Sequence, residues 1–187
     1  MNTIPAPEPT TGGRALVVHE SMFGNTGTIA RAIERGLTSE GVAVTSVGVG
    51  TSNPAEVLDH DLVVLGAPTH AFSLSRPSTR AEAHKQGAVA VADAPGMREW
   101  LERLPASPVG PRFAVFDTRV TKVSKLPFSA GRAEARLVRR AGYQLMAAPQ
   151  GFTVTDVSGP LEHGEEERAE KWGRALGRAV RRTRALC

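Results

Sequence analysis

Residues 20–26 of the chain read Glu20-Ser21-Met22-Phe23-Gly24-Asn25-Thr26. This turn lies between the apolar run 15–18 and a helical pattern of apolar residues over positions 29–37. The first N–H groups of a helix have no intrahelical partner and carry partial positive charge. A strand, a polar turn and a helix N-terminus in this order therefore favour binding of a phosphate or another anion. The alternative is an ordinary turn in which Asn25 or Thr26 only caps the helix.

Two other nucleotide-binding loops do not fit this turn. A dinucleotide fold would place Gly-x-Gly-x-x-Gly after the first strand, and the turn offers one usable glycine. The later Gly48-Val49-Gly50 lacks the third glycine of that pattern. A Walker loop requires Gly-Lys-Ser/Thr, and no lysine occurs between Arg14 and Lys85.

Composition predicts one globular domain. The 187 residues are 41% hydrophobic and 22% charged, which suits a folded domain with a substantial core. We expect residues 1–13 to form a flexible, Pro-rich tail rather than a signal peptide, and 14–187 to form the domain. No apolar run approaches the roughly 20 residues of a membrane helix. The only cysteine is Cys187, so we expect no internal disulfide and a cytoplasmic location.

Strands and helices alternate along the chain. Strands are expected at 14–19, 42–50, 61–66, 113–116 and 143–154, the last interrupted at Pro149. Helices are expected at 26–39, after the N-cap Asn53, and at 78–86, 95–104, 129–141 and 161–186. This order predicts an α/β fold with a doubly wound, five-stranded parallel sheet. Ligands bind such sheets beyond the carboxyl ends of the strands, which here means loops 20–26, 67–80 and 117–127.

Charge and helical periodicity give further expectations. The net charge is +4, and four arginines fall on the helix 129–141. A basic patch could attract nucleic acid or acidic partners, but we interpret these arginines as a solvated helix face. Aromatic residues are only 5% of the chain, which argues against stacking of nucleic-acid bases. The same helix is expected to turn Ala133, Leu137 and Ala141 inward. Trp100 and Trp172 fit the apolar stripes of their helices and are expected in the core.

Three segments resemble the flavodoxin family. Ser21-Met22-Phe23-Gly24-Asn25-Thr26 is similar to the family's FMN phosphate loop, Ser/Thr-x-x-Gly-Asn-Thr after the first strand. Gly66-Ala67-Pro68-Thr69-His70 resembles the Gly-x-Pro-Thr segment that lies beside the isoalloxazine ring. Phe116-Asp117-Thr118 ends the fourth predicted strand, where the family's second flavin loop begins. The resemblance covers the chain from Arg14 to about Leu186.

The resemblance implies a site for non-covalently bound FMN. Ser21, Asn25 and Thr26, with the backbone amides of Met22, Phe23, Gly24, Asn25 and Thr26, would hold the phosphate. The ring would be flanked by Pro68, Thr69, His70, Ala71 and Phe72, and its edge would touch Thr118 and Arg119. The flavin would supply the redox chemistry, so no catalytic acid–base pair and no metal is expected of the protein.

The sequence departs from the family in the second flavin loop. Residues 117–127 contain no aromatic side chain, where the family commonly supplies a tyrosine that stacks on the ring. Phe72 and Phe128 are candidates to cover the ring faces instead. The loop is also basic where electron carriers tend to be acidic. Arg119 near the ring would stabilise the reduced anion and raise the midpoint potential. We interpret His70 as a residue used for local hydrogen bonding rather than as a proton donor.

Three functions remain open from the sequence. The first is electron transfer to or from a redox partner protein through bound FMN. The second is an FMN-dependent reductase of the NAD(P)H:quinone type acting on a small-molecule acceptor, which the long segment 67–93 favours. The third is a flavin-free interaction domain that keeps the fold, which the missing aromatic favours. No nucleic acid or membrane partner is expected.

Overall fold

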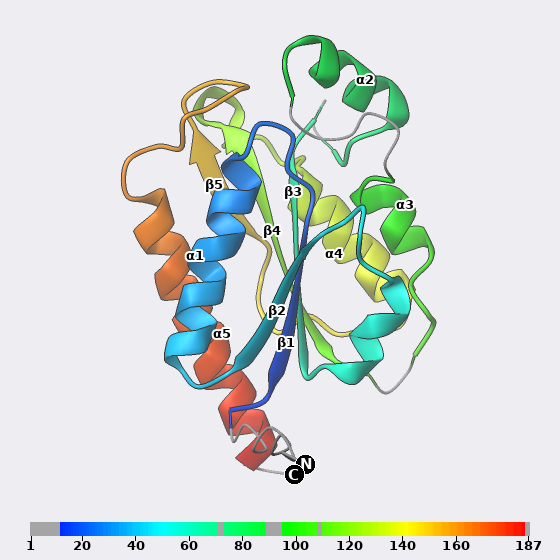
Figure 1. The fold of residues 1–187 in the computed structure, drawn as a ribbon, viewed down its shortest axis with the longest axis vertical. Coiled ribbons are helices and arrows are strands. Elements are labelled where there is room, and N and C mark those ends of the chain that lie inside the picture. The colour runs from blue at the N-terminus through cyan, green and yellow to red at the C-terminus, as the bar shows by residue number, and fades with distance from the viewer. Residues whose placement is uncertain (1–11, 71–72, 89–94, 108–109, 186–187) are drawn as a thin grey trace, which may run out of the picture.

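The computed structural model describes residues 12–70, 73–88, 95–107 and 110–185. These residues form a five-stranded sheet in the order β2-β1-β3-β4-β5, with every neighbouring pair parallel (Figure 1). The strands are β1 (Arg14–His19), β2 (Ala43–Gly48), β3 (Leu62–Pro68), β4 (Arg112–Val120) and β5 (Gln150–Val154). This confirms the doubly wound parallel sheet that the sequence predicts.

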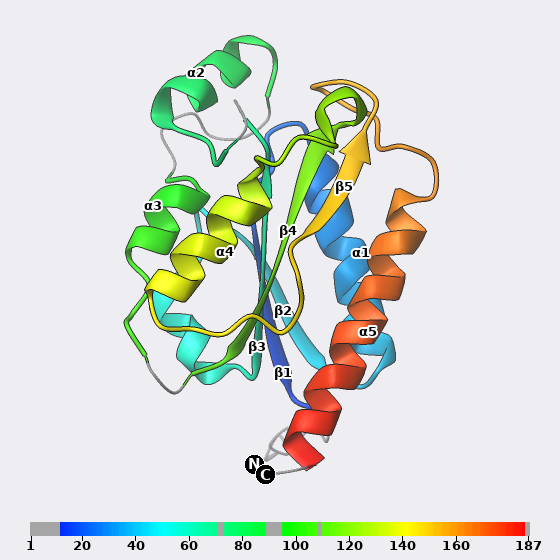
Figure 2. The same cartoon turned by 180° about the vertical axis from the view of Figure 1, so that it is seen from behind.

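Helices cover both faces of the sheet (Figures 1 and 2). One face carries α1 (Asn25–Ser39) and α5 (Glu165–Ala185). The other carries α3 (Met97–Glu102), α4 (Ala130–Arg140) and the short 3-10 helix η1 (Pro54–Asp59). A further helix, α2 (Pro77–Lys85), stands beyond the carboxyl end of the sheet. A single 3-10 turn, η2 (Thr121–Val123), follows β4. No helix of the described residues is long and apolar enough to cross a membrane.

Alternate residues of β1 supply two cores. Leu16 and Val18 face the α3 and α4 side, whereas Ala15 and Val17 face α1 and α5, and all four are fully buried. Burial on both faces explains why the strand reads as an unbroken apolar run. Trp100 lies fully buried in the first core, and Trp172 packs against Phe116 and Phe152 in the second, as expected.

Glycines let α1 and α5 pack closely. A Cβ on Gly36 would lie 2.2 Å from the Glu170 carbonyl oxygen, and one on Gly173 would lie 2.3 Å from the Ile33 carbonyl oxygen. Two backbones at this separation tolerate no side chain at the crossing. The close contact fixes α1, and with it the turn 20–26 at its N-terminus.

Several predicted boundaries change. The fourth strand continues to Val120 instead of ending at Phe116, because residues 116–120 pair with β5. Residues 117–120 are therefore strand, where the sequence predicts the start of a loop. In the expected last strand only Gln150–Val154 belongs to the sheet, while Leu145 makes an isolated bridge with Phe113. The last helix begins at Glu165, not at Leu161.

The buried face of α4 also differs from the expectation. Ala133, Leu137 and Ala141 are only partly buried. The fully covered positions are instead Ala130, Gly131, Glu134, Ala135 and Val138. The helix is thus rotated about its axis relative to the predicted face, and this rotation takes a carboxylic acid into the core.

At the N-terminus, Gly12 and Gly13 are buried, and the Gly13 carbonyl accepts a 2.9 Å hydrogen bond from the Ala43 amide. The rest of the predicted tail lies outside the described residues.

Candidate functional site

The turn 20–26 joins β1 to α1, as the sequence predicts. Gly24 occupies the N-cap position of α1 with φ of +89°, a left-handed conformation that other residues rarely adopt. A Cβ at this position would meet no atom within 4 Å, so the backbone conformation rather than space requires glycine. Gly24 therefore sets the direction in which the turn enters α1.

Those amides are unpaired. None of the N–H groups from Met22 to Thr26 has an acceptor among the described residues. The next amide, that of Gly27, donates to Ser21 Oγ at 3.1 Å. Ser21 thus braces the turn and keeps its own hydroxyl proton available. Five free amides at a helix N-terminus form a concentrated set of donors for an anion.

Two side-chain contacts tie this turn to distant segments. The Thr26 and Thr118 hydroxyl oxygens lie 2.8 Å apart in a buried hydrogen bond between α1 and β4. Asn25 Nδ2 donates to the Ser158 carbonyl at 3.1 Å, and a Cβ on Gly159 would collide with the Asn25 side chain. The loop after β5 consequently closes against the start of α1.

A cavity of about 180 Å³ opens in front of the turn. Its walls include nine residues that the sequence assigns to the site: Met22, Phe23, Asn25, Thr26, Pro68, Thr69, His70, Thr118 and Arg119. Ser21 and Gly24 support the turn without lining the cavity, and Ala71 and Phe72 lie outside the described residues. Phe128 is 63% exposed and is not among the lining residues.

The sequence missed three lining valines. Val120 and Val154 are the last residues of β4 and β5, so the rule that ligands meet the carboxyl ends of strands points to them once these ends are known. Val157 belongs to the loop after β5 and has no such signal.

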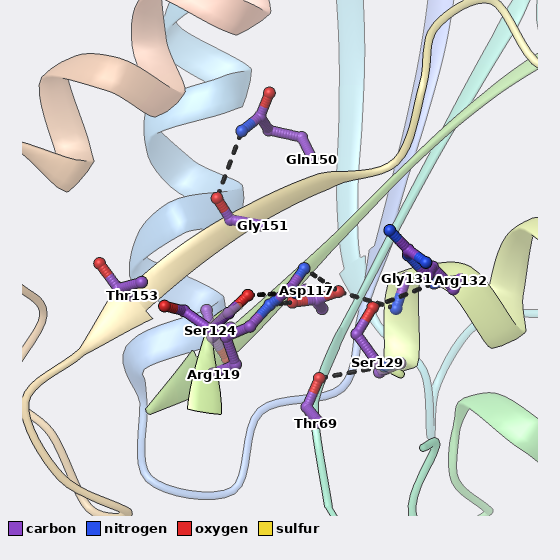
Figure 3. A network of polar contacts seen from close by, with 12 residues as sticks. Thr69, Asp117, Arg119, Ser124, Ser129, Gly131, Arg132, Gln150, Gly151 and Thr153 are labelled. Carbon is purple, nitrogen blue, oxygen red and sulfur yellow. Dashed lines mark hydrogen bonds and ion pairs between the residues drawn. The ribbon is translucent and has the colours of Figure 1, made fainter. Parts of the chain in front are cut away.

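Arg119 is held in an ion pair, not as a free cation (Figure 3). Its Nε and Nη2 atoms donate to the two carboxylate oxygens of Asp117 at 2.6 and 2.9 Å, and its Nη1 donates to the Ser124 carbonyl at 3.3 Å. Asp117 is fully buried. The side chain of Arg119 lies over β5 where Gly151 leaves room, since a Cβ there would be 2.3 Å from Nη2. The charge that the sequence expected beside a flavin is therefore largely compensated.

The N-terminus of α4 is closed, in contrast to that of α1 (Figure 3). The Ala130 amide donates to Thr69 Oγ1 at 3.0 Å, and the Gly131 amide donates to Asp117 Oδ2 at 3.0 Å. The Arg132 amide donates to Ser129 Oγ at 3.3 Å. Protein groups thus satisfy the donors of α4, and the only open helix N-terminus at the cavity is the one that follows Gly24 within the described residues.

His70 lines the cavity as a neutral imidazole. Burial lowers its pKa, and the Glu20 carboxylate offsets part of that effect. Its backbone exchanges two 2.9 Å hydrogen bonds with Ser73, which hold the segment after β3. The second histidine near the site, His19, also has a lowered pKa, owing to burial and to the charge of Arg31.

Two buried acids in this region were not recognised from the sequence. Glu20 accepts from the Ser75 hydroxyl at 2.6 Å and from the Met97 amide at 2.8 Å, so it ties the end of β1 to α3. Glu134 on α4 is fully buried, and neither of its carboxyl oxygens has a hydrogen-bond partner among the described residues. Burial, with the nearby Asp117 and Glu20 carboxylates, raises the pKa of Glu134 well above 4.5. The core therefore favours the neutral form of this acid.

The segment after β3 packs on the turn. Ala83 and Ala88, the first of them on α2, form a small apolar cluster with Met22 and Phe23. Arg80 bonds to Ser75 at 3.0 Å and to Glu99 at 3.2 Å, so α2 is anchored to α3. This arrangement holds α2 against Met22 and Phe23, two of the residues that line the cavity.

Comparisons with known proteins agree with this architecture. No protein-family model matches the chain. A 41-residue segment is 49% identical to putative diflavin flavoprotein A 3 of Synechocystis sp., and a 66-residue segment is 33% identical to putative diflavin flavoprotein A 4 of that organism. These matches cover 22% and 33% of the chain but only 7% and 11% of the relatives.

Solved structures match over nearly the whole chain. A flavodoxin from the domain Archaea has a TM-score of 0.60 and 18% identity, covering 89% of this chain and 98% of its own. The flavodiiron core of Flv1 from Synechocystis sp. has a TM-score of 0.63 and 21% identity, covering 92% and 37%. Oxidised flavodoxin 1 from Bacillus cereus has a TM-score of 0.59 and 14% identity, covering 86% and 94%. The shared strand order and these likenesses show that the chain has the flavodoxin-like fold.

Proposed function

We propose that the protein binds FMN non-covalently and transfers electrons through it. The observation that carries this proposal is the set of five amides from Met22 to Thr26, which have no partner among the described residues and belong to the turn beside the cavity. Unpaired amides at a helix N-terminus, with hydroxyls beside them, suit a phosphate. The satisfied donors of α4 make the open N-terminus of α1 more significant, because only one of the two helices leaves its amides free.

The named relatives support a flavin as the ligand. The solved structures include flavodoxins, and the curated relatives are described as diflavin flavoproteins. One of the curated matches reaches 49% identity, though over a short segment. A flavin with a phosphate satisfies both the names of the relatives and the donors of the turn, and FMN is the simplest such molecule.

The lining residues include candidates to contact each end of FMN. The amides of the turn and the hydroxyl of Thr26 would hold the phosphate, while Pro68, Thr69 and His70 would lie beside the ring and Thr118 at its edge. A volume of about 180 Å³ is below the roughly 300–1,000 Å³ of pockets that enclose a whole ligand. The cavity therefore suits the phosphate end, with the ring at its open mouth. When bound, the flavin supplies the one- and two-electron chemistry.

A flavin-dependent reductase is the second candidate. The observation in its favour is that α2 packs on Met22 and Phe23, which line the cavity, and is anchored through Arg80. A helix held in this position could bound a site for a small acceptor such as a quinone. His70, neutral and beside the cavity, offers one hydrogen-bonding group to that acceptor.

Titration with FMN tests the proposal. We expect the purified protein to bind FMN with a shift in the flavin absorption spectrum. Riboflavin, which lacks the phosphate, should bind roughly a hundredfold more weakly, because several charge-assisted hydrogen bonds are lost. A protein that binds neither compound is a flavin-free domain, and one that binds both equally does not use the turn for phosphate.

Steady-state turnover separates carrier from reductase. We expect the FMN-loaded protein to exchange electrons with a chemical reductant but to consume NADPH slowly in the presence of a quinone. Sustained NADPH consumption that depends on the quinone would select the reductase instead.

A further inference from the structure

The loop between β4 and α4 presents apolar side chains to solvent. Phe128 is 63% exposed and Leu126 is 41% exposed, although large apolar side chains are usually covered. The loop begins directly after Val120, which lines the cavity, and Arg119 binds the Ser124 carbonyl within it. Figure 2 shows the loop at the carboxyl end of the sheet, where it leads back into α4. An exposed aromatic residue beside a candidate redox site is a natural anchor for a partner.

Cations precede and follow these apolar residues along the chain. Lys122 and Lys125 are exposed on the same loop. On α4, four exposed arginines follow at positions that share one side of the helix: Arg132, Arg136, Arg139 and Arg140. With Ala135 and Pro149 they line an open groove of about 580 Å³. The loop and the helix together form a surface that we call the α4 basic face, made of the six cations with Leu126 and Phe128.

No ion pair within the described part of the chain neutralises these six charges. Between Val120 and Gln150 the chain contains a single acid, Glu134, against the six cations. Glu134 is fully buried, so it adds no negative charge to the exposed surface that carries these cations. None of the four α4 arginines forms an ion pair with a described residue. On α5, by contrast, five arginines pair with Glu or Asp: Arg168, Arg174, Arg178, Arg181 and Arg184.

We propose that the α4 basic face is the docking surface for an acidic segment of a partner protein that also carries apolar side chains. Charge complementarity selects the acidic partner, and protein–protein interfaces combine apolar anchors with charged residues. Phe128 is the single aromatic residue of this face, so the face lacks the series of aromatic platforms that single-stranded nucleic acids use. Arginine and phenylalanine are also favoured at the centres of interfaces. That the partner exchanges electrons rests on the proposed function, whereas the docking does not.

Binding of a defined peptide tests the docking. The probe is a fluorescent synthetic peptide in which Glu and Asp alternate with Phe and Leu, and its control replaces the acids with Gln and Asn. We expect the full-length protein to bind the acidic peptide, more weakly as salt is added, and to bind the amide peptide poorly. The charge-reversal variant Arg136→Glu/Arg139→Glu should weaken binding by roughly tenfold or more.

Matched variants separate this surface from net charge and from general stickiness. Lys171→Glu/Arg182→Glu makes the same change in net charge on α5, at the opposite face of the sheet, and should leave binding within about twofold. Phe128→Ala should weaken binding by roughly tenfold, whereas Leu58→Ala, which removes a similarly exposed side chain on η1, should not. Equal losses in target and control variants would overturn the proposal.

Two further results would overturn it. One is the absence of peptide binding by the wild-type protein at low salt. The other is tighter binding of a single-stranded oligonucleotide than of the acidic peptide, which would assign the face to nucleic acid. FMN titration keeps the two proposals apart, and Arg136→Glu/Arg139→Glu should bind FMN as the wild type does. If the wild-type protein binds FMN but not the peptide, only the docking proposal is refuted. If it binds the peptide but not FMN, only the flavin proposal is refuted.

Discussion

The hydroxyl oxygens of Thr26 and Thr118 lie 2.8 Å apart, although the residues are 92 positions apart in the chain. Two hydroxyls in one hydrogen bond use one proton, so the other proton remains free to donate. The pair lies where the N-terminus of α1 meets the last residues of β4, and both residues line the cavity. It therefore joins the candidate phosphate and ring loops into one site and still offers a donor to a ligand.

Replacing Thr26 with alanine should weaken FMN binding by about 1.5–3 kcal/mol, the value of a hydrogen bond to a charged group. Thr26→Ser keeps the hydroxyl and should retain most of the affinity. Thr38→Ala, the same change on the exposed far part of α1, is the control. Fluorescence titration of FMN measures all three, and unchanged affinity in Thr26→Ala would assign the turn another role.

The ion pair between Asp117 and Arg119 changes the reason why Arg119 should affect the midpoint potential of a bound flavin. From the sequence alone, Arg119 is a cation that raises the potential. In the structure its charge is matched by a buried carboxylate, so the pair as a whole is nearly neutral. Arg119→Ala should still lower the flavin midpoint potential, because it leaves the Asp117 carboxylate uncompensated beside the site. It should also destabilise the fold by about 3–5 kcal/mol, as measured by urea unfolding.

A double variant isolates the cause of both effects. Asp117→Asn/Arg119→Met removes the two charges together and should lose less stability than Arg119→Ala alone. Its midpoint potential should lie nearer to that of the wild type. A double variant with a potential as low as that of Arg119→Ala would mean that the arginine charge acts on the flavin by itself.

The fold could be predicted wherever local chemistry and tertiary structure agree. The apolar run of β1 is buried on both faces, and Asn53 caps η1 by accepting from the Ala55 amide at 3.1 Å. The prediction failed at 117–120, where polar residues concealed a strand that exists because its backbone pairs with β5. It failed again on α4, because the buried face includes Glu134, and a pattern of apolar residues gives no signal for a buried acid.

The candidate site could also be predicted only where the local sequence carries the signal, and not where tertiary structure decides. Nine lining residues were predicted because their segments resemble the flavin-binding segments of the flavodoxin family and lie at or near the carboxyl ends of strands. Val157 could not be found, since its position depends on the course of the loop after β5. The pairing of Arg119 with Asp117 was also missed. Residues two apart on a strand share a face, but nothing in the sequence says that both are withdrawn from solvent.

Glu20 should control both the stability of α3 and the titration of His70. Glu20→Ala leaves the Met97 amide and the Ser75 hydroxyl without their acceptor in a buried site, which should cost about 2–4 kcal/mol of unfolding free energy. In the milder Glu20→Gln variant, loss of the carboxylate charge should lower the pKa of His70 further, because that charge partly offsets the effect of burial. NMR titration of the imidazole measures this, with the exposed Glu102→Gln as the control. A raised pKa would contradict the electrostatic assignment.

Glu134 should make the protein less stable as the pH rises. Its pKa in the folded state lies well above the ordinary 4.5, so the unfolded chain releases this proton at a lower pH than the folded one. The contribution of the protonated Glu134 to the unfolding free energy is complete below about pH 4.5. It is lost as the pH rises from there through the folded-state pKa, by up to about 1.4 kcal/mol per pH unit. Glu134→Gln keeps the shape of the neutral acid and should flatten this decline.

The difference between wild type and Glu134→Gln isolates that acid from the histidines. His19 and His70 have lowered pKa values, so their effect is a loss of stability as the pH falls below about 6.5. Because both proteins carry the two histidines, this contribution cancels when urea unfolding free energies are subtracted at each pH. The remaining difference should increasingly favour Glu134→Gln from acid to alkaline pH, whereas the exposed Glu102→Gln should show no such trend. A difference independent of pH would mean that Glu134 is ionised in the folded protein, and its burial without a partner would then lack an energetic explanation.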